Sequence, residues 1–139
     1  MQLDEISVLS EDLRHQALIH PSREVFFPNA CVDRVFWELT IADRVILGFD
    51  ILTMENSKPC TWGTSGYELD GDLLAKRWDV CVTLSLQLAM RDLGRIGALS
   101  GLKPPFDDVY YAIVAIDQKG WTKMLHEPRS IVVRRSPDK

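Results

Sequence analysis

The clearest pattern along the chain is a pair of stretches whose apolar residues recur with the period of a helix. The first follows Asn29, a potential N-cap, and is expected to span residues 29–43. Its apolar face consists of Val32, Val35, Phe36 and Leu39. The second is expected over residues 72–93 and to end at the glycines that follow. Its apolar arc consists of Leu74, Trp78, Cys81, Val82, Ser85, Leu88 and Ala89.

Runs of branched and aromatic residues predict the strands. Residues 45–52 are too apolar for a surface and indicate an interior strand, with a bulged partner over residues 60–69. Residues 109–116 form the clearest strand, and Asp117–Gly120 resembles a hairpin turn. Shorter strands are predicted at 24–27, 121–125 and 131–135, and a short helix at 11–20. These elements predict an α+β fold, with two main helices packed on one face of a largely antiparallel sheet.

Length and composition indicate one domain over residues 1–139. The acidic N-terminus lacks the features of a signal peptide, and no apolar run is long enough to span a bilayer, so we expect a cytoplasmic protein. Three widely spaced cysteines, Cys31, Cys60 and Cys81, are expected to be reduced. A net charge of −4 disfavours direct nucleic-acid binding.

Motifs of catalysis are missing from the sequence. It contains neither a nucleophile elbow nor a phosphate-binding glycine loop, so we expect no catalytic residue and no cofactor. Asp50 is conspicuous because it interrupts an apolar strand, where an unpaired carboxylate is costly. One alternative is therefore a small enzyme in which Asp50 acts with a histidine as acid and base. The candidate histidines are His15, His20 and His126.

An acidic junction precedes the long predicted helix. Glu68, Asp70 and Asp72 could supply oxygens to a hard cation, but helix capping explains them better, and no metal site is expected. Trp62 and Tyr67 lie just upstream, and Asp50 is expected on the neighbouring strand. Carboxylates that steer a basic partner and aromatic rings that anchor it are typical of a protein-binding surface.

The order of elements over residues 45–93 resembles a family of small bacterial immunity proteins that accompany polymorphic toxins, including those of contact-dependent inhibition systems. In this chain Gly48-Phe49-Asp50 stands where the family is expected to carry Gly-Gly-Asp. The resemblance implies a non-catalytic inhibitor that binds one cognate toxin domain, and many such toxins are nucleases with basic clefts. Besides the enzyme, a ligand-binding or oligomerising α+β domain is the remaining alternative.

Overall fold

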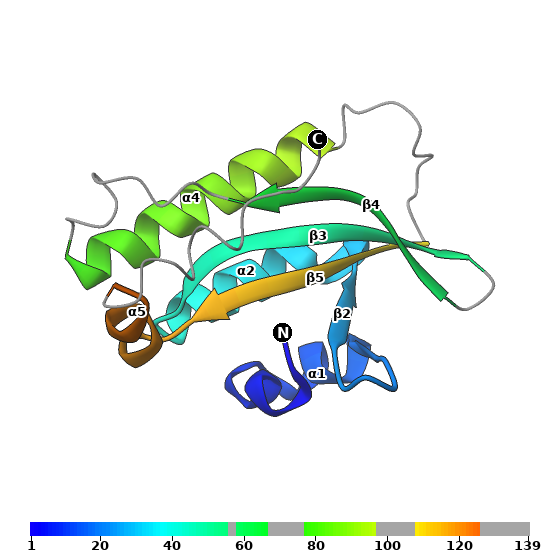
Figure 1. Cartoon of the computed structure of the whole chain (residues 1–139), viewed down its shortest axis with the longest axis horizontal. Coiled ribbons are helices and arrows are strands. Elements are labelled where there is room, and N and C mark those ends of the chain that lie inside the picture. Colours follow the sequence, from blue (N-terminus) through cyan, green and yellow to red (C-terminus); the bar gives the residue numbers. More distant parts are fainter. Residues whose placement is uncertain (56–57, 67–76, 97–107, 126–139) are drawn as a thin grey trace.

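The computed structural model of the chain describes residues 1–55, 58–66, 77–96 and 108–125 (Figure 1). Its strands are β1 (Leu18–Ile19), β2 (Val25–Pro28), β3 (Val45–Glu55), β4 (Lys58–Gly66) and β5 (Val109–Ile116). Its helices are η1 (Leu3–Val8), α1 (Glu11–Gln16), η2 (Asn29–Cys31), α2 (Val32–Ile41), α4 (Trp78–Ile96) and α5 (Gln118–Leu125).

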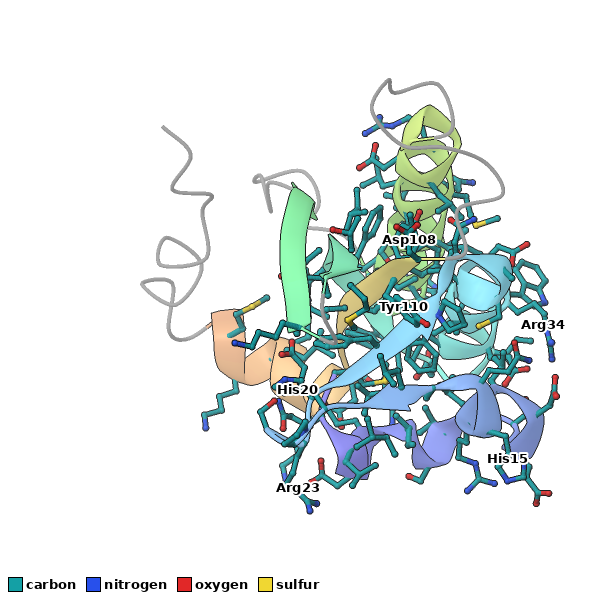
Figure 2. The ribbon with its side chains drawn as sticks, turned by 90° about the vertical axis from the view of Figure 1, so that its right-hand side faces the viewer. His15, His20, Arg23, Arg34, Asp108 and Tyr110 are labelled. Atoms are coloured by element: carbon teal, nitrogen blue, oxygen red, sulfur yellow. The ribbon has the colours of Figure 1, made fainter. Side chains whose placement is uncertain are left out.

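The described strands form one antiparallel sheet in the order β1-β2-β5-β3-β4. Helices α2 and α4 pack against each other and against one face of it, as Figure 2 shows edge-on. The predicted α+β architecture is therefore confirmed. At its centre the Phe49 ring lies between two others, with centroids 5.4 Å from Phe36 of α2 and 5.5 Å from Tyr111 of β5.

Helix α2 buries the apolar face that its sequence predicts, since Val32, Val35, Phe36 and Leu39 are all buried. It ends in a Schellman motif, in which the Arg44 N–H donates to the Leu39 carbonyl and the Asp43 N–H to the Thr40 carbonyl. This arrangement holds Asp43 at a φ of 65°, a left-handed conformation that glycine usually supplies.

Helix α4 follows the predicted pattern in its described part. Cys81, Val82, Ser85 and Ala89 are buried, whereas the opposite face is exposed. Trp78 corrects one expectation, because it is only half-buried, with its ring centroid 6.2 Å from that of Trp121. Gly94 does not end the helix, which extends to Ile96. The predicted start at Asp72 lies outside the described residues.

A bulge in β3 ties this strand to α4. The register with β5 shifts between Ile46 and Gly48, and Gly48 has a φ of 155°, which disfavours a side chain there. The Ile46 N–H donates to Ser85 Oγ of α4 over 2.9 Å, and Ser85 Oγ donates to the Val82 carbonyl over 3.0 Å. A single buried hydroxyl therefore satisfies a strand amide that would otherwise be left without a partner.

The segment after β5 is a helix, so the predicted hairpin turn and strand at 121–125 are wrong. Asp117 caps α5, accepting a hydrogen bond from the Gly120 N–H on Oδ1 at 2.8 Å. Trp121 and Met124, one helical turn apart, are buried. Packing explains why this helix contains a glycine. A Cβ at Gly120 would lie 2.6 Å from Cγ1 of Ile116.

The N-terminal residue bridges β2 and β5 beyond the point where their direct pairing ends. The Met1 ammonium donates to the Ile113 carbonyl at 2.7 Å, and the Met1 carbonyl accepts from the Val25 N–H at 2.9 Å. Ser10 caps α1 as predicted, but the helix ends at Gln16 instead of continuing to His20, because Leu18–Ile19 pairs with β2.

Candidate functional site

The structure describes only part of the protein-binding surface that the sequence predicts. Asp50 and Trp62 lie on adjacent strands, β3 and β4. Trp62 is the extra residue of a bulge, since Ile51 pairs with Gly63 and Leu52 with Thr61. The bulge predicted in this strand is therefore present. The remaining predicted residues, Tyr67, Glu68, Asp70 and Asp72, lie outside the described residues.

Asp50 lies on the face of the sheet that α2 and α4 leave open. It is half-buried and pairs with Ala112 of β5. Alternation along β3 places it on the same face as Leu52, which packs with Ala112 and Phe26. Burial lowers the pKa of the Met1 ammonium, while the negative charges of Glu5, Glu24 and Asp50 act in the opposite direction. Asp50 is thus partly solvated and electrostatically coupled to the Met1 ammonium, which lessens the cost expected of a carboxylate in an apolar strand.

The acid–base pair of the enzyme alternative is not assembled in the described part of the chain. His15 is exposed on α1, and His20 belongs to the turn between β1 and β2. His126 lies outside the described residues. Among the hydrogen bonds of the described residues, none joins Asp50 to a histidine.

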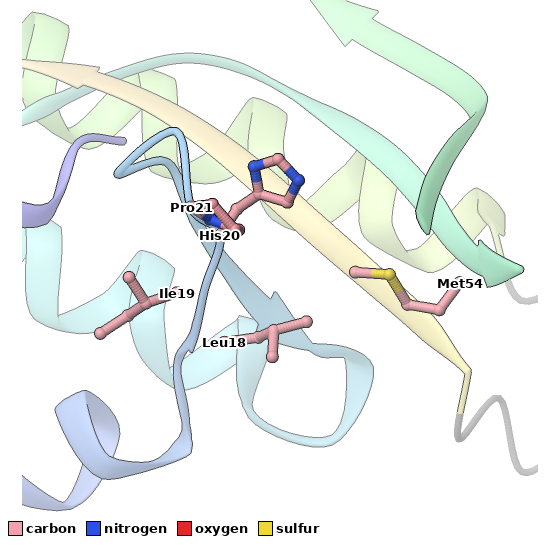
Figure 3. Close-up of a pocket in the computed structure, with 5 residues that line it drawn as sticks. All are labelled: Leu18, Ile19, His20, Pro21 and Met54. Atoms are coloured by element: carbon pink, nitrogen blue, oxygen red, sulfur yellow. The ribbon is translucent and has the colours of Figure 1, made fainter. Parts of the chain in front are cut away.

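A groove lies on the open face of the sheet, at the end of β3 that carries Met54. It has a volume of about 340 Å³, and the described residues that line it are Leu18, Ile19, His20, Pro21 and Met54. The His20 and Met54 side chains extend into it from opposite sides of β5 (Figure 3). The His20 ring also contacts Phe26, with centroids 6.0 Å apart. The sequence did not reveal this groove, because its two walls come from distant segments.

The outer surface of α2 carries an exposed apolar pair, Trp37 and Ile41. Their exposed fractions are 58% and 71%, and the two residues are one helical turn apart. Arg34, also on α2 (Figure 2), forms an ion pair of 2.9 Å with Asp12 of α1. Trp37 and Ile41 are not among the residues that the sequence predicted for a binding surface. Their signal was present, since both residues fall on the helical face opposite Val32 and Leu39.

The described residues do not support metal binding or thiol chemistry. They contain no group of three or more histidine, cysteine, aspartate or glutamate side chains able to hold a metal ion. Cys31 is buried, which raises its thiol pKa to about 11, so it is a poor nucleophile. Cys81 is buried in α4. Among the described helices, none combines the length and apolar character needed to cross a membrane.

Comparisons with known proteins found no relative of this chain. No family model, no curated protein and no solved structure matches the chain.

Proposed function

We propose that this chain is a cytoplasmic protein-binding module that neutralises a cognate toxin domain by direct contact. The observation that carries the binding proposal is the exposure of Trp37 and Ile41 on α2. Large apolar side chains that remain in water next to one another mark interaction surfaces, and tryptophan is enriched among the residues that dominate binding energy.

The charges around the apolar pair favour a basic partner. Asp33 and Glu38 flank Trp37 on α2, and Asp12 engages the nearby Arg34. Three carboxylates against one guanidinium leave this surface acidic, in keeping with the net charge of −4. Complementary charge accelerates association with a basic protein. The choice of a toxin as partner rests on the resemblance of residues 45–93 to immunity proteins.

The surface predicted from the sequence remains a second candidate for the contact. Asp50 and Trp62 occupy β3 and β4, and β4 is the last strand of the sheet in the described part of the chain. Such a strand presents unpaired backbone groups to a partner. Pro59 and the bulge at Trp62 interrupt this edge, which makes it a poorer docking surface than α2.

The test requires a cognate toxin domain, sought among the neighbouring genes, and uses it in a growth-rescue assay and in calorimetric titration. The double variant Trp37→Ala with Ile41→Ala should weaken binding by at least about 30-fold, because hot-spot residues contribute about 2 kcal/mol or more. Met90→Ala, an exposed methionine on α4, is the matched control and should bind as the wild type does. Absence of binding and rescue by the wild type would refute the proposed function.

A second comparison separates the two candidate surfaces. If the α2 variant binds normally, charge reversal at Glu68 and Asp70 should weaken binding more than reversal at Asp107 and Asp108, and more at low salt than at high salt. Asp72 is left unchanged because it is a potential helix cap. Equal binding by both charge-reversal variants would exclude the acidic junction.

A further inference from the structure

We propose that the groove between residues 18–21 and Met54 binds a small, neutral, apolar molecule through a carbonyl group that accepts a hydrogen bond from His20 Nε2. This site is independent of the proposed toxin contact, since it lies on the open face of the sheet, and α2 packs on the other face.

The groove has the dimensions and lining of a small-molecule site. Its volume of about 340 Å³ falls at the lower end of the ~300–1,000 Å³ typical of ligand pockets. Four of the five described residues that line it are apolar, and two of these, Leu18 and Ile19, are 39% and 49% exposed. Covering these side chains with an apolar ligand would remove them from water, which is the main source of affinity in such pockets.

The orientation of His20 is set by its own turn. The Ser22 N–H donates to Nδ1 at 3.2 Å, and Ser22 Oγ lies 2.9 Å from the same nitrogen. Because Nδ1 accepts, the neutral imidazole carries its proton on Nε2, which points away from the turn. The turn itself is held by two backbone hydrogen bonds, from His20 to Glu24 and from Arg23 to His20. His20 therefore presents one oriented donor to an otherwise apolar lining.

The lining of the groove favours a neutral ligand, because its described residues include no aspartate, glutamate, lysine or arginine. Asp50 shares the open face with Leu52 and Ala112, but it lies four residues along β3 from Met54 and does not line the groove. An anionic head group would lose its hydration against this lining, which offers no lysine or arginine among its described residues. A cationic head group is itself a hydrogen-bond donor, so it would gain no hydrogen bond from the His20 N–H. A ketone, ester or amide carbonyl attached to an apolar body meets both conditions.

The experiment uses prodan, a neutral naphthalene ketone whose fluorescence reports the polarity around its carbonyl. The full chain should bind it saturably, with emission at shorter wavelength than in water. Met54→Glu should weaken binding at least about 10-fold, because a carboxylate would have to be desolvated in the groove. Met90→Glu on α4 is the matched control and should bind as the wild type does.

Two further variants test the details. His20→Phe keeps an aromatic ring but removes the donor, so affinity should fall about 2- to 10-fold and the bound emission should shift further to shorter wavelength. Ile19→Glu places a charge on an exposed position of β1 and provides the test if Met54→Glu does not fold. A neutral medium-chain methyl ketone should displace prodan at least about 10-fold better than the fatty acid anion of equal length.

The outcomes are distinct. Lack of saturable binding by the wild type, or equal loss of binding in the Met54 and Met90 variants, would overturn the site. Unchanged affinity and emission in His20→Phe would overturn the role of the histidine. Preference for the fatty acid anion would overturn the selection of a neutral ligand. Because no arm uses a toxin, these outcomes are independent of the proposed function.

Discussion

Replacement of Ser85 by alanine tests how α4 holds the bulged strand β3. Ser85 is 1% exposed, and its Oγ is the acceptor for the Ile46 N–H at 2.9 Å. Ile46 is itself fully buried beside a register shift against β5. Removing the hydroxyl leaves this amide with no partner among the described residues. The space that the lost oxygen leaves is too small to admit a water molecule without a rearrangement.

The expected cost follows from these contacts. Loss of a partner for a buried N–H costs about 1–3 kcal/mol, whereas the higher helix propensity of alanine returns about 0.5 kcal/mol. The second bond of Ser85, to the Val82 carbonyl, adds little, because that carbonyl lies within α4 and can accept from the helix backbone. The free energy of unfolding should therefore fall by about 0.5–2.5 kcal/mol.

Urea unfolding followed by circular dichroism and tryptophan fluorescence measures this loss. Hydrogen exchange should show faster exchange at the Ile46 amide in the variant. Thr83→Ala is the matched control, because Thr83 lies on the exposed face of the same helix and its Oγ1 donates to the Asp79 carbonyl at 3.2 Å. A loss below about 0.5 kcal/mol with unchanged protection of Ile46 would refute the role given to Ser85.

Three further predictions concern stability. Asp43→Gly should raise the free energy of unfolding by about 0.5–1 kcal/mol in urea melts, because φ is 65° there; a decrease would contradict the strain argument. Burial raises the pKa of Tyr111 to about 12 and of Cys31 to about 11, so stability should be lost as pH rises from about 9 to 12, and Tyr111→Phe should reduce this loss in alkaline titrations. Trp78→Ala should cost less than the ~3–5 kcal/mol of a fully buried tryptophan, and a larger loss in urea would show closer packing than its half-burial indicates.

One of the two candidate surfaces could have been predicted from the sequence, and the other could not. Trp37 and Ile41 could have been found from the sequence, because a helical wheel of residues 32–41 places both outside the buried arc. The groove could not, since the β1–β2 turn and Met54 are separated in sequence and meet only across β5. Asp50 was recognised as unusual, but its position on the open face followed only from the register with Ala112.

The periodicity of the sequence determined the elements that are long enough to bury a full face. The apolar spacing of α2 and the run of β5 specified both element type and buried residues, because burial acts on the same side chains that create the pattern. The short segment from Asp117 to Leu125 was ambiguous: its Asp-x-x-Gly start suits a turn as well as a helix cap. Only tertiary structure decided it, since helix formation allows Trp121 and Met124 to be buried together against Val45 and Cys81. The insertion of β5 between β2 and β3 was likewise decided by tertiary structure, because pairing between distant strands depends on how whole faces pack and leaves no local signal in the sequence.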